Sequence, residues 1–335
     1  MWGLFFKQKK VWVGLLFLIT LVTLSIGNTV VNDGEIKRVS FLYDDKGQLM
    51  GAPFPPSTEF LLGSDRKGYD LMHLVIEGAK WTIGVGVLIT VLRIVLGLIF
   101  SIILERTPSK LFKVIEAFFD SFSVVPLTMI AYFVLQHVLV FANGSTPDPF
   151  HERVGFEIII LTLFAVPTIS FYLTNEIKLL FKNEFVGAAR VLGGQKSHIF
   201  KKHIAPHLFP IILILFMQQF IQVLFILVHL GVLKVFFGGT IVFFDGDIDS
   251  VTHEWTGLLG MYYLSFTTHP WIPLVPIIFF TLTIVSSNLI LSGIKKSYEQ
   301  SKIKPFKKNL YTSNIKRQNK EFSFQPIKMN LSKYR

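Results

Sequence analysis

The sequence contains no cysteine and few charged residues, and these two deficits exclude several kinds of protein. Without cysteine, the chain of 335 residues has no disulfide framework, no thiolate metal ligand and no cysteine nucleophile. Charged residues make up 16% of the chain, against about a quarter in soluble globular domains. Hydrophobic residues make up 51%, and 34 residues are phenylalanine. This composition predicts a protein that is surrounded by lipid rather than by water.

Long apolar segments recur along the chain, and most approach the ~20 residues that a helix needs to cross a bilayer. They predict an all-α, polytopic membrane protein with six transmembrane helices. The expected spans are 11–26, 81–104, 121–142, 156–181, 208–233 and 271–294. Three lysines precede the first span, but no small-residue cleavage site follows it. We therefore expect an uncleaved helix rather than a signal peptide.

The basic residues predict an orientation in the membrane. If the N-terminus is cytoplasmic, 24 of the 33 Lys and Arg residues fall in inner segments, 8 fall in outer segments, and Arg93 lies within a span. Lys and Arg collect on the cytoplasmic side of membrane proteins, so both termini are predicted to be cytoplasmic. The net charge of +11 then reflects topology, and no nucleic-acid partner is expected.

This orientation divides the chain into four parts. Residues 1–27 hold the N-terminal cytoplasmic end and the first helix, and residues 28–79 form an extracytoplasmic segment. Residues 80–300 form the membrane core, which includes a cytoplasmic loop at 182–207. Residues 301–335 form a basic cytoplasmic tail, which we expect to be partly disordered and to lie near anionic lipid headgroups.

The cytoplasmic loop has the pattern of two short helices. Residues 184–192 contain good helix formers, and Gly193-Gly194 predicts the end of that helix. A second helix is expected over 197–203, with Pro206 ending it. The stretch 193–197 ends like a phosphate-binding loop, but the required glycines are absent and no strand precedes it, so no ATPase is predicted.

Three motifs in this chain resemble those of one family. Residues 184–206 resemble the cytoplasmic EAA loop of bacterial ABC-importer permeases, in the version of the oligopeptide/dipeptide/nickel family. Residues 62–70 (LGSDRKGYD) resemble that family's L-G-T-D-x-x-G-R-D, and Trp255, Gly257, Trp271 and Pro276 follow its order of W-G, P-W and P. Gly187 departs from the loop's usual glutamate, Tyr69 replaces arginine, and 229–240 differs from the family pattern.

The resemblance implies a type I ABC-importer permease fold and the role of the C-type transmembrane subunit, a binding-protein-dependent transport system inner membrane component. It implies a B-type permease as heterodimer partner, two ABC ATPase subunits that bind the ATP, and an extracytoplasmic substrate-binding protein. The subunit would hold no cofactor and no catalytic residue, and it would lie in the bacterial cytoplasmic membrane. Its cargo would be di- or oligopeptides.

The resemblance also assigns the contact with the ATPases to the cytoplasmic loop. The implied contact residues are Glu184, Phe185, Ala188, Ala189, Arg190, Gly193, Phe200, His203 and Pro206. Two alternatives stay open: the same machine importing nickel or another small solute, and a non-transporting membrane scaffold or sensor that retains the docking loop. A membrane-embedded enzyme is a further class, but the sequence has no H-E-x-x-H motif and no Ser-Lys pairing at a telling spacing.

Polar residues inside the expected spans are candidates for function, because they are costly in lipid. Gln218, Gln222 and His229 fall on one helical face. They are predicted either to line a translocation path or to form hydrogen bonds between helices. Arg93 needs a partner, and the sequence offers the three carboxylates of Asp120, Glu157 and Glu176.

Two patterns resemble metal sites without meeting the requirements. Asp245, Asp247 and Asp249 alternate as in a calcium loop, but serine and threonine occupy the positions of the required glycine and glutamate. His203 and His207 have a metal-ligand spacing, but Pro206 interrupts the predicted helix. We therefore predict no metal site.

Overall fold

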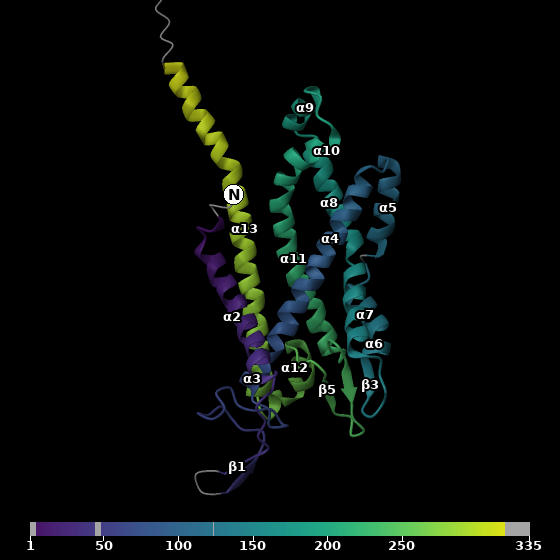
Figure 1. Ribbon diagram of the computed structural model, residues 1–335, viewed down its shortest axis with the longest axis vertical. Coiled ribbons are helices and arrows are strands. Elements are labelled where there is room, and N and C mark those ends of the chain that lie inside the picture. The colour runs from purple at the N-terminus through teal and green to yellow at the C-terminus, as the bar shows by residue number, and fades with distance from the viewer. Residues whose placement is uncertain (1–4, 44–47, 123, 319–335) are drawn as a thin grey trace, which may run out of the picture.

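The computed structural model describes residues 5–43, 48–122 and 124–318 of the chain. Most of the described chain is helical (Figure 1). The α-helices are α2 (Lys9–Asn32), α3 (Leu71–Ala79), α4 (Val85–Glu105), α5 (Ser109–Phe122), α6 (Leu127–Leu139), α7 (Phe150–Leu163), α8 (Val166–Phe181), α9 (Glu184–Val191), α10 (Lys196–Ile199), α11 (Ala205–Val232), α12 (Trp255–Tyr262) and α13 (Trp271–Gln318). Two π-helical turns, η1 (Lys80–Gly84) and η2 (Phe200–Ile204), and a 3-10 helix, η3 (Tyr263–Thr267), join some of them. The strands are β1 (Phe41–Tyr43), β2 (Leu49–Gly51), β3 (Val140–Ala142), β4 (Thr240–Val242) and β5 (Ile248–Ser250).

Four helical stretches in the described chain are long and apolar enough to cross a membrane. They are Lys9–Asn32, Leu71–Glu105, Lys196–Val232 and Trp271–Ser301. The pair α7 and α8, bent by 40°, makes a fifth if it is counted as one span. The expected span at 121–142 is not one long helix. Its helix α6 has 13 residues, because Pro126 at the N-cap interrupts the helix and Val140 begins a strand. Six continuous spans are therefore not confirmed.

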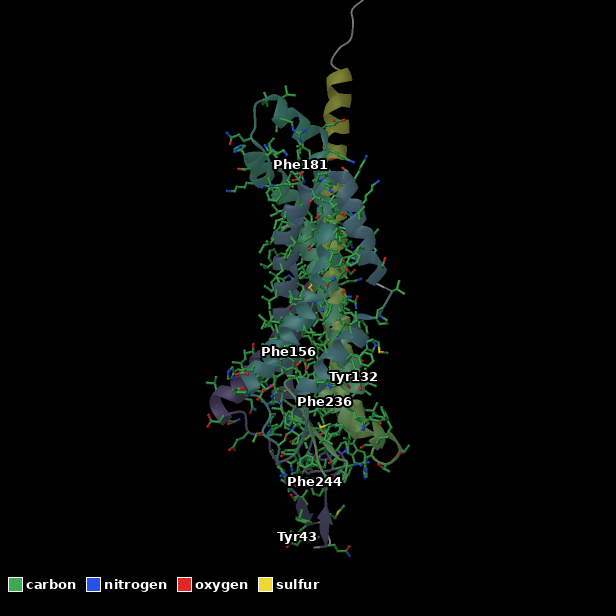
Figure 2. All side chains as sticks on the ribbon, turned by 90° about the vertical axis from the view of Figure 1, so that its right-hand side faces the viewer. Tyr43, Tyr132, Phe156, Phe181, Phe236 and Phe244 are labelled. Carbon is green, nitrogen blue, oxygen red and sulfur yellow. The ribbon has the colours of Figure 1, made fainter. Side chains whose placement is uncertain are left out.

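The helices run along the long axis of the molecule, and its two ends differ (Figure 1). Helices α9 and α10 form one end, here called the loop end. The strands and α12 lie at the opposite end, here called the strand end. Figure 2 shows the same separation, with Phe181 near the loop end and Tyr43 and Phe244 at the strand end. The predicted outer segments around 28–79 and 234–270 thus gather at one end, away from the predicted inner segment 182–207.

Short strands stiffen the strand end, which the all-α prediction did not anticipate. Strands β1 and β2 form an antiparallel hairpin. Strand β3 pairs in parallel with β4, and β4 pairs antiparallel with β5. Because β3 follows α6 while β4 follows α11, this small sheet ties the ends of two membrane helices together.

The sequence around Asp65 connects the first external segment to the strand end. The Asp65 carboxylate accepts hydrogen bonds from the backbone N–H groups of Lys67 and Tyr69, at 2.9 and 2.7 Å, and from the Tyr262 hydroxyl at 2.8 Å. Gly68 has φ +83°, and a Cβ there would lie 2.1 Å from the Val39 carbonyl oxygen. This packing gives the L-G-S-D-R-K-G-Y-D stretch a structural role.

The aspartates of the calcium-like pattern also have structural partners. The Lys67 ammonium lies 2.8 Å from Asp249 and 3.9 Å from Asp247. His253 Nε2 lies 3.7 Å from the other Asp249 oxygen. Asp245 accepts a hydrogen bond from the backbone N–H of Asp247 at 3.1 Å. These contacts hold the β4–β5 turn against the 62–70 segment.

Trp255 anchors the core at the strand end. Its indole is fully buried and donates to the Val75 carbonyl at 2.7 Å, while its backbone N–H donates to the Thr82 hydroxyl at 3.0 Å. The surrounding apolar cluster draws on α2, α3, α11, α12 and α13. The tryptophan of the W-G motif therefore binds α12 to the start of the second membrane stretch.

Helix α13 continues beyond the membrane to Gln318, so the start of the basic tail is helical rather than irregular. The remainder of the tail, 319–335, lies outside the described residues.

At the other end of the chain, α2 packs along α13 with small residues at the contact. A Cβ on Gly14 would lie 2.5 Å from the Ser286 carbonyl oxygen, and one on Gly293 would lie 2.2 Å from a Val11 methyl carbon. Such close backbone approach is a common basis of helix association in membranes.

This contact predicts that Gly14→Val destabilises the protein, whereas Gly27→Val on the same helix does not. A side chain at position 14 meets backbone, which moves with difficulty, and overpacking of this kind costs about 1–3 kcal/mol. No atom lies within 4 Å of a Cβ built on Gly27. Thermal unfolding of both variants in the same detergent measures the difference. Equal melting temperatures would contradict the importance of this contact.

Candidate functional site

The loop at 182–207, predicted to be cytoplasmic, forms the expected pair of helical arms at the loop end. Its first arm is α9, and the glycines end it as expected. Gly193 has φ +82°, and its N–H donates to the Arg190 carbonyl at 3.0 Å. The Gly194 N–H donates to the Ala189 carbonyl at 3.0 Å. These two bonds form a complete Schellman motif, in which glycine occupies the left-handed position.

The second arm does not end at Pro206, so that expectation was wrong. Helix α10, the π-turn η2 and α11 run as one helical stretch of 37 residues, Lys196–Val232. Pro206 stands in the first turn of α11, where a missing N–H does little harm. No break therefore separates the second arm from α11.

A small apolar core holds the two arms together. Val186, Ile199 and Ile204 are buried in it, and Ala189 and Phe200 pack against them. The ring of Phe185 lies 5.1 Å from that of His207 and remains 39% exposed. The predicted contact residues thus lie on one compact hairpin. Ala189, Phe200 and His203 are half-buried, whereas Glu184, Ala188, Arg190, Gly193 and Pro206 are exposed.

The most exposed apolar side chains of the loop lie within the predicted contact range 184–206 but were not singled out among its residues. Val191 and Leu192 are 89% and 87% exposed, and they lie where α9 ends. Together they form a small exposed apolar surface at the end of the arm. The available signal was their position beside Gly193, at the tip of the hairpin.

The polar face of α11 is exposed along the membrane. Gln218, Gln222 and His229 are all exposed, and the aromatic side chain of Phe225 lies on the same face. None of these three polar side chains forms a hydrogen bond with other described residues. Hydrogen bonding between helices of this chain therefore does not account for them in the described part of the structure.

Arg93 does not pair with the acidic residues that the sequence suggested. Its guanidinium is fully buried and donates to the Leu161 carbonyl through Nε at 2.9 Å and Nη2 at 2.5 Å. Nη1 lies 3.3 Å from the Gln219 side-chain oxygen. The Leu161 carbonyl is available because the Ala165 N–H donates to Thr162 instead, at the bend between α7 and α8. A broken helix, rather than a carboxylate, supplies the acceptor.

Glu157, one of the expected Arg93 partners, belongs to a different cluster at the strand end. Its carboxylate accepts from the Gly238 N–H at 3.1 Å, and that of Glu254 accepts from the adjacent Phe237 N–H, also at 3.1 Å. Ser250 and Thr256 donate to Glu254 at 3.2 and 3.0 Å. Burial raises the pKa of Glu254 from 4.5 to about 7, and its hydrogen bonds offset only part of that shift.

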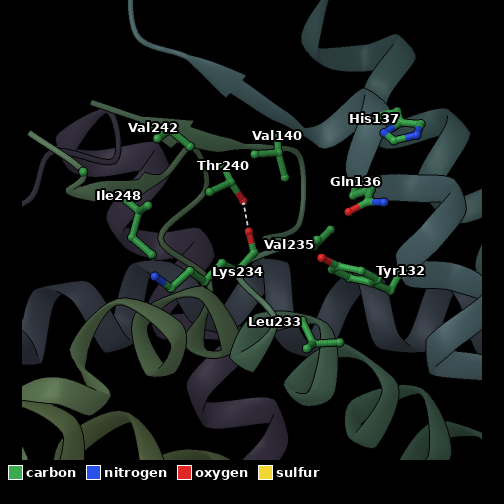
Figure 3. A pocket seen from close by; sticks show the side chains of 11 residues that line it. Tyr132, Gln136, His137, Val140, Leu233, Lys234, Val235, Thr240, Val242 and Ile248 are labelled. Carbon is green, nitrogen blue, oxygen red and sulfur yellow. Dashed lines mark hydrogen bonds between the residues drawn. The ribbon is translucent and has the colours of Figure 1, made fainter. Parts of the chain in front are cut away.

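A pocket of about 780 Å³ opens between α6, the end of α11 and the small sheet (Figure 3). Tyr132 and Gln136 extend from α6 toward Val235, and Lys234 lies on the opposite side beneath Ile248. Thr240 forms part of the wall between them. The lining residues are Tyr132, Gln136, His137, Val140, Leu233, Lys234, Val235, Thr240, Val242, Gly246 and Ile248. No acidic side chain is among these described lining residues.

Comparison with known families identifies the architecture. Residues 93–304, more than half of the chain, match the family of binding-protein-dependent transport system inner membrane components. The chain belongs to this family. A relative, the oligopeptide transport system permease protein OppC of Bacillus subtilis (strain 168), is 21% identical over 296 residues, which cover 88% of this chain and 87% of the relative.

Membership explains the apolar helices, which belong to a multi-pass inner-membrane permease subunit of an ABC importer. The family is one of transport permeases, not of enzymes. The matched region begins at Arg93 and contains the loop, the polar face of α11 and the pocket.

The buried Glu254 predicts a dependence of stability on pH. A raised carboxyl pKa means that the folded protein keeps a proton that the unfolded chain has released between pH 4.5 and about 7. The contribution of this retained proton to the free energy of unfolding is present in full below pH 4.5 and is lost as the pH rises through about 7. Glu254→Gln does not titrate. We expect its stability relative to the native protein to increase by up to roughly 3 kcal/mol from low to high pH.

Thermal unfolding of the native protein and of Glu254→Gln, at about pH 5 and about pH 8, measures this change. The conservative variant Asp245→Asn is the control, because Asp245 is exposed in the nearby β4–β5 turn and an asparagine oxygen can still accept from the Asp247 N–H. A stability difference between Glu254→Gln and native protein that is the same at both pH values would contradict the raised pKa.

Proposed function

We propose that this subunit forms, with a second permease subunit of the B type, the translocation path of an importer for di- or oligopeptides. The similarity to an oligopeptide permease over most of both chains supports the cargo class. The observation that carries the proposal is the unbroken helical stretch Lys196–Val232. It joins an exposed docking surface at one end to an exposed polar face in the membrane.

In the proposed mechanism, the loop end is cytoplasmic and contacts one of two ATPase subunits. Those subunits bind and hydrolyse ATP, and this chain holds no cofactor. Val191 and Leu192 extend the predicted contact of residues 184–206 with an apolar tip. When the ATPases close, they move the hairpin as one body, because its apolar core resists internal rearrangement.

The displaced hairpin then moves α11, which is continuous with its second arm. Gln218, Gln222 and His229 line the proposed path across from the partner permease. Amide and imidazole groups suit peptide backbone, which carries both donors and acceptors. An extracytoplasmic binding protein delivers the peptide to the strand end. Both chain termini are cytoplasmic in this arrangement, in agreement with the distribution of Lys and Arg.

The proposal predicts that Val191→Glu combined with Leu192→Glu abolishes association with the ATPases while membrane insertion is unchanged. Both side chains are almost fully exposed, so the substitutions leave the core of the hairpin intact. Burying two carboxylates in an apolar contact is strongly unfavourable. Mild detergent extraction followed by affinity purification shows whether an ATPase pair and a second permease copurify.

Gln195→Glu serves as the control, because it adds a carboxylate to the same exposed turn and removes no apolar surface. We expect this variant to retain the ATPases. Copurification of the ATPases with the double variant would exclude the tip as the contact. A native protein that brings down no ATPase would support a non-transporting scaffold, and uptake of nickel but not peptide would support the solute alternative.

A further inference from the structure

Lys234 occupies a backbone position that favours glycine. It follows Leu233, the C-cap residue of α11, and has φ +63°. Its N–H donates to the Gly231 carbonyl at 2.9 Å, and the next N–H, of Val235, donates to the Leu230 carbonyl at 2.9 Å. These bonds form a complete Schellman motif, whose left-handed residue is usually glycine. Helix α9 of the same chain ends in the same motif and does have glycine, Gly193, at that position.

The strained turn is held by a buried side chain. The Thr240 hydroxyl, which is fully buried, donates to the Lys234 carbonyl at 2.9 Å and accepts from the Phe236 N–H at 2.9 Å. The surrounding structure therefore holds residue 234 in the left-handed region whatever its side chain. A lysine at a position where glycine fits with less strain points to a use for its ammonium group.

The ammonium group has no partner among the described residues, although carboxylates lie close in the sequence. The two aspartates that flank Gly246 are engaged elsewhere. Asp245 accepts from a backbone N–H within its own turn, and Asp247 faces Lys67 at 3.9 Å. Attraction to the negative end of the helix dipole would also favour lysine here, but it does not require the left-handed position.

Lys234 lines the pocket of about 780 Å³ shown in Figure 3, which has no acidic side chain among its lining residues. Tyr132 and Gln136 supply hydroxyl and amide donors from α6, and His137 adds an imidazole. Aliphatic side chains of Val140, Leu233, Val242 and Ile248 complete the wall. A positive charge, neutral donors and aliphatic surface together suit a small solute that carries a carboxylate and an apolar side chain.

The pocket also lies at the end of the proposed path. Leu233 lines it and follows His229 by one helical turn, on the exposed face that carries Gln222. We propose that this pocket is the outer subsite of the permease and that Lys234 binds the free C-terminal carboxylate of the incoming peptide. The inference rests on the proposed function, and it adds the chemical group that the subunit recognises.

The test compares trialanine with its C-terminal amide in proteoliposomes that contain the complete importer and its binding protein. Initial uptake rates of each peptide are expressed relative to those of the native complex, so that the preference of the binding protein cancels. Lys234→Gly is expected to lower uptake of trialanine roughly tenfold, because one charge-assisted contact is lost. Uptake of the amide is expected to change less than about twofold, since it has no carboxylate to bind.

Two further variants control for structure and charge. Asp33→Gly relieves a similar left-handed residue, φ +51°, at the end of α2, and it should leave both rates unchanged. Lys234→Arg keeps the positive charge and should retain at least part of the preference for trialanine. Lys234→Gly should unfold at a temperature no lower than that of the native protein, because glycine adopts the turn without strain.

Each outcome decides the inference. Selective loss of trialanine uptake in Lys234→Gly, with partial retention in Lys234→Arg, supports the carboxylate subsite. Unchanged uptake of both peptides, or an equal loss of both, overturns it and leaves the proposed peptide import intact. Failure of the proposed function has a separate signature, in which the native complex imports neither peptide. That result overturns the subsite together with the function on which it rests.

Discussion

The membrane part of the structure depends on the hydrogen bonds that Arg93 donates to a backbone carbonyl group left free by a broken helix. Lipid offers no partner for a free carbonyl group, so a bend inside the bilayer must be satisfied by protein. Here α7 and α8 are bent by 40°, and Arg93 of α4 donates twice to the freed Leu161 carbonyl. The same guanidinium reaches Gln219 of α11. The side chain of Arg93 therefore connects α4, the bend between α7 and α8, and α11.

This connection places α11 at the centre of the molecule. Its extension at the loop end forms one arm of the loop, its middle contacts Arg93, and its far end is followed by Lys234 and borders the pocket. A helix of this length behaves as a stiff rod, provided that its backbone bonds are intact. Pro206 and Pro210 lie close to its start, and the π-turn η2 locally widens the helix before them. Any flexibility of the rod is thus concentrated near the loop.

The strand end is cross-linked by several contacts between distant segments. Trp255, Asp65 and the Lys67–Asp249 ion pair join segments that are far apart in the chain. Glu157 and Glu254 accept two consecutive backbone N–H groups of the loop that follows α11. Because buried carboxylates are costly unless they are well hydrogen-bonded or protonated, this arrangement holds the loop in one conformation.

Much of this protein is readable from the sequence, and the rest has identifiable physical causes. Apolar length predicts the membrane helices at both ends of the chain, and Gly193-Gly194 predicts the end of α9, because these signals are local. The hydrogen-bond partner of Arg93 was not predictable, because no residue pattern indicates that the backbone carbonyl of Leu161 is free to accept. The prediction that a helix ends at Pro206 was wrong because proline is tolerated in the first turn of a helix as well as after its end. Whether a polar face such as that of α11 is buried or exposed is likewise invisible to periodicity.

The sequence by itself determined that the chain crosses a membrane, which end of it is basic, and which loop forms a pair of short helices. Those properties follow from composition and from residues close together in the chain. Only the tertiary structure decided that Val191 and Leu192 form the exposed tip and that the bend at Leu161 is satisfied by Arg93. It also decided that Lys234 lines a pocket with residues of α6. These facts depend on distant segments meeting, and only the folded chain brings such segments together.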